Sequence, residues 1–160
     1  GNLKLSGLTS LSDVAAEAFS KHKGNLRFGG ITELSDAAAC TLAKHNGRLF
    51  LHGLTSLSDA QAEALAKHEG WLYLDGLTSL SDAQAEAFSK HEGDLYLNGL
   101  TELSDAAAEA LAKHEGVLHL RLTKLSDSAA EALSKHNGFL GLDHDYLPPS
   151  ASKILKDAGH

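Results

Sequence analysis

A unit of 23 residues recurs along almost the whole chain and constrains the fold more than any other feature. Six copies span residues 3–25, 26–48, 49–71, 72–94, 95–117 and 118–139, and residues 140–160 form a degenerate copy with a C-terminal cap. The first five copies have equal length, and the sixth is one residue shorter. Because repeats of this size stack on their neighbours to bury a shared core, the sequence predicts a single repeat domain over residues 1–160.

Each copy begins with a short strand. In the fourth copy Leu72 and Leu74 share one face of an extended segment, while Tyr73 and Asp75 share the other face. The leucine face suits a buried core, so the other face should point outward. Gly76 then ends the strand, where we expect a left-handed or tightly bent backbone.

A capped helix completes each copy. In the third copy Ser58 suits the N-cap position, and Gln61 stands at the spacing of a capping box. Alanine is the best helix former, and the Ala-rich run predicts a helix from Asp59 to about His68. Gly70 follows as the expected helix stop.

Stacked copies can bury a core that one strand and one helix cannot. Parallel strands are joined by right-handed crossovers, so we expect a right-handed α/β solenoid with a parallel sheet on one face and helices on the other. A short helix over residues 150–158 should cap the last copy with Ile154 and Leu155 inward. The first copy lacks a polar cap, which predicts self-association through Leu3 and Leu5.

The segment Leu-x-Leu-x-Gly-Leu resembles the leucine-rich repeat family, most closely its short, Ala-rich bacterial variants that carry Leu-Ser-Asp-Ala. The resemblance covers roughly residues 3–139. Where that family usually has Asn or Cys after the strand, this chain has Leu54, Leu77 and Leu100. The side-chain ladder that normally satisfies the turn backbone is therefore absent, and another group must take its role.

Six of the ten histidines occupy one repeat position. They are His22, His45, His68, His91, His114 and His136, and stacking should set them on one line about 4.8 Å apart. One interpretation is a metal-binding or pH-sensing stripe, since imidazole binds metals and titrates near neutrality. We favour a structural interpretation, in which each ring closes its helix and bonds to loop backbone in place of the missing ladder. Because a metal site needs three or four converging ligands, we expect no metal and no cofactor.

Composition and motifs exclude several classes of function. The net charge of −7 and the absence of any Lys/Arg run argue against nucleic-acid binding. No apolar stretch approaches the roughly 18 residues of a membrane span. An active site is a singular arrangement, whereas the Ser, Thr, His and Asp residues here are periodic, so we expect no enzyme. The single cysteine, Cys40, is expected to be an inert surface thiol.

The outward strand positions vary between copies and form the candidate binding face. Phe50, Tyr73 and Tyr96 occupy one such position in three successive copies, and His119 extends this aromatic row. The residue before each strand and the second outward position add polar groups and one Trp. The candidate ligand- or partner-binding residues are Arg48, Phe50, His52, Trp71, Tyr73, Asp75, Tyr96, Asn98, His119 and Arg121.

We expect a non-enzymatic module that presents the outward face of its sheet to a protein or peptide, because exposed aromatic residues anchor interfaces. Carbohydrate or cell-wall binding on the aromatic row is the alternative. A third interpretation is a purely structural or engineered repeat scaffold, in which aromatic pairs only stabilise the sheet. Near-identity of the third to fifth copies favours recent duplication or consensus design, whereas the shortened sixth copy argues against a fully idealised design.

Overall fold

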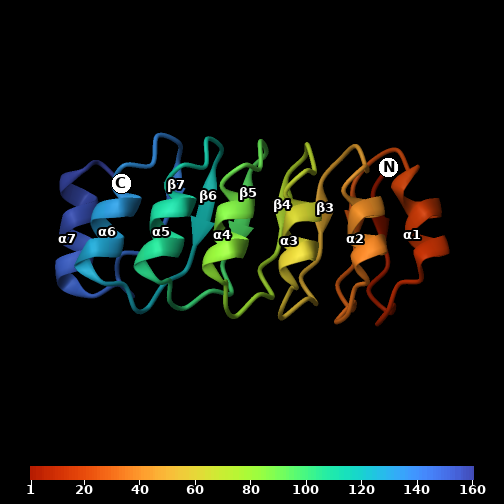
Figure 1. Cartoon of the computed structure of the whole chain (residues 1–160), viewed down its shortest axis with the longest axis horizontal. Helices are drawn as coiled ribbons and strands as arrows, with labels where there is room; N and C mark the ends of the chain where they lie inside the picture. Colours follow the sequence, from red (N-terminus) through yellow and green to blue (C-terminus); the bar gives the residue numbers. More distant parts are fainter.

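The computed structural model describes residues 1–160, which form seven strand–helix units stacked in chain order (Figure 1). The strands are β1 (Leu3–Lys4), β2 (Leu26–Arg27), β3 (Leu49–Phe50), β4 (Leu72–Tyr73), β5 (Leu95–Leu97), β6 (Leu118–Leu120) and β7 (Leu140–Gly141). The helices are α1 (Asp13–Ser20), α2 (Asp36–Leu42), α3 (Asp59–Leu65), α4 (Asp82–Phe88), α5 (Asp105–Leu111), α6 (Asp127–Leu133) and α7 (Pro149–Asp157). All strands pair in parallel, in the order β1 to β7, which confirms the predicted α/β solenoid.

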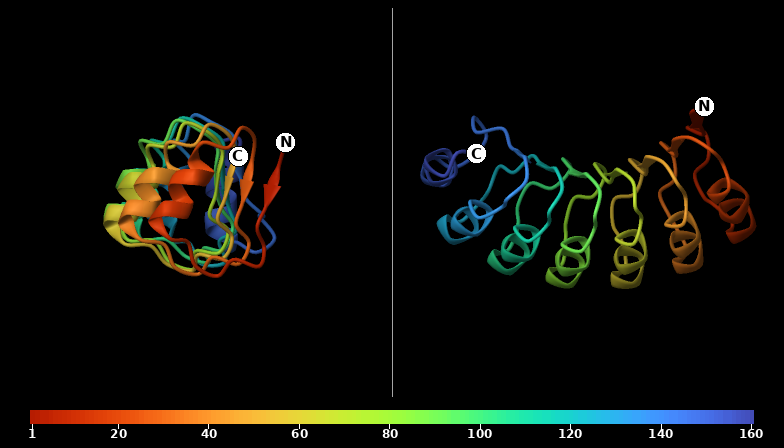
Figure 2. Two further views of the ribbon diagram at one scale, coloured as in Figure 1. Left: turned by 90° about the vertical axis from the view of Figure 1, so that its right-hand side faces the viewer. Right: turned by 90° about the horizontal axis from the view of Figure 1, so that it is seen from above.

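The solenoid curves, with the sheet on its concave side and the helices on its convex side (Figure 2). Neighbouring aromatic rings on the outward face of the sheet have centroids 4.1–4.5 Å apart. Neighbouring rings of the repeated histidines, which follow the helices, have centroids 6.0–6.4 Å apart. The units are therefore closer together on the sheet side, and the stack bends toward the sheet.

One apolar core of 42 buried residues runs through the stack. The register sets equivalent leucines side by side, as in Leu49 beside Leu72 and Leu72 beside Leu95. From the helix layer, Ala62 and Leu65 of α3 face these leucines and are fully buried. The small alanine side chains allow the helix and strand layers to pack closely, as the sequence predicted.

A ladder of Ser and Asp side chains links the helix N-termini of neighbouring repeats. The hydroxyl of Ser81 accepts the backbone N–H of Gln84 at 3.1 Å and donates to Asp59 of the preceding repeat at 3.1 Å. Four further pairs make the same Ser-to-Asp bond: Ser35–Asp13, Ser58–Asp36, Ser104–Asp82 and Ser126–Asp105. The predicted N-caps are confirmed, and each capping serine also bonds its repeat to the one before it.

The helices are shorter than the sequence predicted. α3 ends at Leu65, three residues before the expected end at His68. The backbone N–H groups of Lys67 and His68 bond to carbonyls only three residues earlier, at 3.2 and 3.0 Å. Such a tight turn closes a helix quickly. It also turns His68 into the interior, where its side chain is almost fully buried.

The repeated glycines allow close packing of neighbouring repeats. Neither Gly70 nor Gly76 has a positive φ, although Gly47, at the position equivalent to Gly70, has a φ of 150°. Of the two alternatives expected for Gly76, the left-handed backbone is absent, and the residue lies in a turn after β4. A Cβ on Gly76 would lie 2.1 Å from the carbonyl oxygen of His52, and one on Gly70 would lie 2.3 Å from that of Gly47. Only a residue without a side chain lets the backbones of adjacent repeats approach so closely.

The two ends of the stack differ. α7 covers the last repeat, with Leu155 buried and Ile154 packed against the core, as predicted. β1 has a strand partner on one side only, and its Leu3 is half-buried, as is Leu5 directly after it. No helix combines the length and the apolar character needed to cross a membrane.

Candidate binding face

Phe50, Tyr73, Tyr96 and His119 form one continuous stack of rings across β3 to β6. Parallel pairing places each of them beside the next. Successive ring centroids lie 4.1, 4.1 and 4.5 Å apart, with interplanar angles of 12°, 12° and 10°. The structure thus brings together, on the concave face, the aromatic row that the sequence suggested.

Stacking changes what the aromatic row offers to a ligand. Phe50, expected to be exposed, is only 7% exposed, because Tyr73 covers one side of its ring and the Arg27 guanidinium lies 4.3 Å from its centroid. Tyr73 and Tyr96 each have a neighbouring ring on both sides. Ring edges and hydroxyls therefore reach the solvent, and ring faces do not. A sugar, which stacks on a free ring face, has little to bind here.

Tyr73, in the middle of the aromatic row, acts as a neutral polar group. Burial, together with the nearby Tyr96 hydroxyl, raises the pKa of Tyr73 to about 12. Tyr73 therefore keeps its proton throughout the physiological pH range. Its hydroxyl is available to both donate and accept hydrogen bonds.

Trp71 widens the apolar surface on one side of the aromatic row. It immediately precedes β4, and its ring centroid lies 6.5 Å from that of Tyr73 and 6.3 Å from that of Tyr96. The Arg48 guanidinium carbon lies 3.6 Å from the Trp71 ring, a cation–π contact. The indole is half-buried, so it is held in place while part of it remains accessible.

A polar network lies on the other side of the aromatic row. His52 Nδ1 is 3.2 Å from Asp75 Oδ2, and Asn98 donates its backbone N–H and its side-chain amide to Asp75 Oδ1 at 3.1 and 2.8 Å. Burial would raise the pKa of Asp75, but the hydrogen bonds from His52 and Asn98 outweigh it and lower that pKa. The carboxylate is therefore ionised and already occupied by neighbours on the face.

Arg121 lies toward the C-terminal end of the face, where it shares a concavity with Asn98 and His119. It is exposed after β6, and its guanidinium carbon is 5.1 Å from the ring of Tyr146, in the segment before α7. Sequence reasoning missed Tyr146, and it also missed Phe139, which is 63% exposed with its ring 5.7 Å from that of His119. Phe139 precedes β7 just as Trp71 precedes β4, so the same periodic reasoning would have found it.

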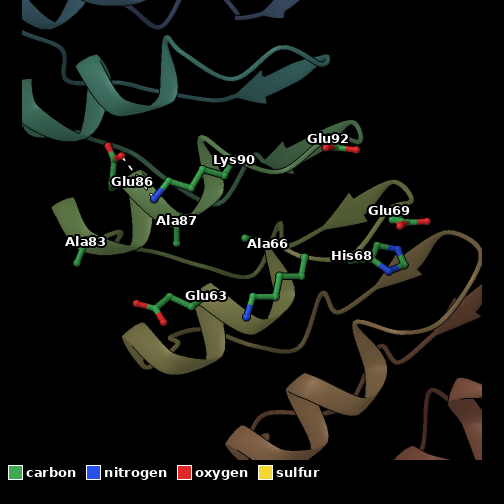
Figure 3. A pocket seen from close by; sticks show the side chains of 10 residues that line it. Glu63, Ala66, His68, Glu69, Ala83, Glu86, Ala87, Lys90 and Glu92 are labelled. Carbon is green, nitrogen blue, oxygen red and sulfur yellow. Dashed lines mark ion pairs between the residues drawn. The ribbon is translucent and has the colours of Figure 1, made fainter.

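The largest hollow of the surface lies elsewhere, on the convex side between α3 and α4 (Figure 3). It has a volume of about 660 Å³ and contains Ala66, Ala83 and Ala87, whose short side chains leave space between the helices. Exposed lysines and glutamates surround it, and the pair of Lys90 and Glu86 is 3.8 Å apart. Exposed pairs of this kind contribute little, so we assign no ligand to this groove.

The repeated histidines form a buried column along the interior. From His45 to His136 each ring is 1–3% exposed and nearly parallel to the next, with interplanar angles of 4–18°. The centroid spacing of 6.0–6.4 Å is wider than the expected 4.8 Å because this layer lies nearer the convex side. Two parallel rings at this spacing cannot both bring a nitrogen to about 2.1 Å from one ion. No group of three or more His, Cys, Asp or Glu side chains is placed to hold a metal.

The histidine column bonds to backbone only in part. Nε2 of His45 lies 2.7 Å from the carbonyl oxygen of Gly24, and Nδ1 of His68 lies 3.4 Å from that of Ala43. The same kind of contact is made by His22 and His91, but not by His114 and His136: seven buried ring nitrogens of the column have no hydrogen-bond partner. The predicted replacement of the Asn ladder therefore holds for four of the six histidines.

Burial keeps four of these rings neutral. It lowers the pKa of His68, His114 and His136, and it lowers the pKa of His91 to about 4. Near pH 7 the rings from His68 to His136 are thus uncharged, stacked groups that fill space between repeats. This environment fits the structural interpretation of the column.

Comparison with known proteins adds no family assignment. The chain matches no family model, and it matches no curated protein. The architecture is therefore assigned from the structure itself. The chain is an α/β repeat solenoid.

Proposed function

We propose that the chain is a non-enzymatic module that binds a protein or an extended peptide on the concave face of its sheet. One observation carries this proposal: the aromatic row and Trp71 form a contiguous surface at positions that the repeat does not specify. Buried positions recur from copy to copy, whereas these positions change. Residues that the stacking of repeats does not require can instead contact a ligand.

The chemistry of the face suits a peptide. Tyr and Trp are large and rigid, so they supply contact area at a small cost in conformational entropy. The Tyr73 hydroxyl, Asn98 and His52 add hydrogen-bonding groups within the same surface. A carbohydrate fits less well, because the faces of the inner rings are covered by one another.

We further propose that the module is leucine-rich-repeat-like and related to the short, Ala-rich bacterial variants. The pattern Leu-x-Leu-x-Gly-Leu and the concave parallel sheet with helices outside support this relation (Figure 2). The buried histidines and the Ser–Asp ladder replace the usual Asn ladder in this interpretation.

Peptide selection tests the proposed function. Random dodecapeptides displayed on phage are selected on the wild-type chain, and the dissociation constants of the recovered peptides are measured by fluorescence anisotropy. The variants Trp71→Ala and Tyr73→Ala should weaken binding by about tenfold or more, because such anchors carry most interface energy. The control Glu63→Ala/Lys67→Ala on the convex side should bind as wild type does.

Circular dichroism spectra of all variants check that the fold is intact. If no peptide is recovered above background, or if recovered peptides bind both aromatic variants as tightly as wild type, the proposal is wrong. A glycan array run with the same proteins tests the carbohydrate alternative. A glycan that binds wild type but not Tyr73→Ala would favour a sugar ligand instead.

A further inference from the structure

Arginine occurs only on the sheet side of this solenoid. Of the 14 basic residues, three are arginines: Arg27, Arg48 and Arg121. Arg27 lies in β2, Arg48 immediately precedes β3, and Arg121 immediately follows β6. The convex side carries lysine alone, chiefly in the turns after the helices. Arginine and lysine thus lie on different sides of the solenoid, and these two cations differ in the groups that they bind best.

Every arginine side chain lies over an aromatic ring. The guanidinium carbon of Arg27 is 4.3 Å from the Phe50 centroid, that of Arg48 is 3.6 Å from the Trp71 ring, and that of Arg121 is 5.1 Å from the Tyr146 ring. Stacking uses the flat face of a guanidinium and leaves its edge N–H groups, which match a carboxylate, for other partners. None of the ion pairs within the chain includes an arginine. These cations are oriented by the protein and remain without a counter-charge.

Two of the arginines join Lys4 at the N-terminal end of the face. Strand register places Lys4 beside Arg27 and Arg27 beside Phe50. A concavity of about 290 Å³ is formed there by Asn2, Lys4, Asn25, Arg27, Arg48 and Phe50. Its polar groups are cations and amides, with no carboxylate among them. The Asn25 side-chain oxygen accepts the Arg48 backbone N–H at 3.1 Å, which leaves the Asn25 amide group as a further donor.

The charge of this end opposes that of the whole chain. The net charge is −7, yet the outward strand positions of the first three repeats hold no acidic residue. The first such carboxylate along the sheet, Asp75, is already bonded by His52 and Asn98. A local excess of fixed donors on an otherwise acidic molecule is complementary to a single anionic group, whereas a long polyanion would meet repulsion elsewhere.

We propose that Lys4, Arg27 and Arg48 bind a carboxylate side chain of the partner, which is therefore an acidic peptide segment lying across the concave face. The inference rests on the proposed function and specifies its ligand. Arg27 and Tyr73 stand two strand intervals apart, about 10 Å, which equals about three residues of extended chain. Because side chains on one side of an extended chain recur every second residue, the segment carries Asp or Glu two or four residues from a side chain that contacts Trp71 and Tyr73.

The test uses the peptides selected on the wild-type chain. Asp and Glu should be enriched at one position among them. For one such peptide, replacing that Glu by Gln, or replacing Arg27→Gln or Arg48→Gln in the protein, should each raise Kd about tenfold, because a charge-assisted hydrogen bond is lost. Combining the peptide change with Arg27→Gln should add little, because both remove one interaction. Lys67→Gln on the convex side is the matched control that should leave Kd unchanged.

The outcomes separate this inference from the proposed function. Peptides that lose affinity for Trp71→Ala, yet show no acidic enrichment and bind Arg27→Gln and Arg48→Gln as they bind wild type, would overturn the carboxylate site and leave the binding face standing. Failure to recover any peptide would overturn both. A phosphoserine at the acidic position that binds more than tenfold tighter than Glu would show that the cluster takes phosphate groups, which also contradicts the carboxylate assignment.

Discussion

Lowering the pH from 7 to 4.5 should destabilise the fold chiefly through the histidine column. In the unfolded chain these imidazoles have an ordinary pKa of 6.5, whereas burial lowers the pKa of His91 in the folded chain to about 4. Above pH 6.5 His91 is neutral in both states and contributes no pH dependence. Below pH 6.5 the unfolded chain takes up protons that the folded chain does not, so the free energy of unfolding falls as the pH falls.

The magnitude follows from the width of that window. One pKa unit corresponds to about 1.4 kcal/mol, so His91 alone removes about 3 kcal/mol of stability between pH 6.5 and 4. The pKa values of His68, His114 and His136 are lowered for the same reason, and their losses add to this one. Since a domain of this kind is stable by only about 5–15 kcal/mol, we expect unfolding in mild acid.

Urea unfolding at pH 7.5, 6.0, 5.0 and 4.5 measures this loss, with circular dichroism and the fluorescence of Trp71 as probes. The variant His91→Gln carries no titratable group at this position. It should be less stable than wild type at pH 7.5 but should lose about 2 kcal/mol less between pH 7.5 and 4.5. Ser79→Ala, which alters an exposed residue outside the column, serves as the control and should follow wild type. Parallel stability curves for wild type and His91→Gln would refute the reasoning.

Three further predictions concern packing and exposure. Gly76→Ala should lower the free energy of unfolding by about 1–3 kcal/mol, because its Cβ would meet backbone at 2.1 Å, whereas Gly7→Ala meets no atom within 4 Å and should change little in the same urea titration. Ser81→Ala should cost about 1–2 kcal/mol through loss of the cap and the inter-repeat bond, with Ser79→Ala as its control. Cys40 is exposed, so Ellman's reagent should modify it in the folded protein as fast as in urea.

The fold was predictable because every copy repeats the same pattern of strand residues, N-cap and helix residues. Alternating leucines such as Leu72 and Leu74 specify a strand, and a serine such as Ser58 specifies where a helix begins. The distance between neighbouring repeats on the helix side was not predictable from the period alone, since it depends on how far side chains separate the helices. The histidine rings therefore lie 6.0–6.4 Å apart rather than at the strand spacing.

The positions of the candidate face were predictable, but their environments were not. Periodicity places Tyr73 and Tyr96 on the outward side, yet it does not reveal that neighbouring rings would cover each other or that Phe50 would be buried. The periodicity also indicated two outward positions that the list of candidate residues omits. Arg27 occupies the same strand position as Phe50, and Phe139 the same position as Trp71.

The narrow spacing of the aromatic row has a consequence for how any extended ligand can match it. Three successive ring spacings of 4.1, 4.1 and 4.5 Å come to about 13 Å, the length of four residues of extended chain at about 3.3 Å each. Side chains on one side of such a ligand recur every second residue, so those at positions i and i+4 fall opposite Phe50 and His119. The one at i+2 falls between Tyr73 and Tyr96. Because the ring spacing and the residue spacing differ, a ligand side chain lies directly opposite a ring of the row only once in every four ligand residues.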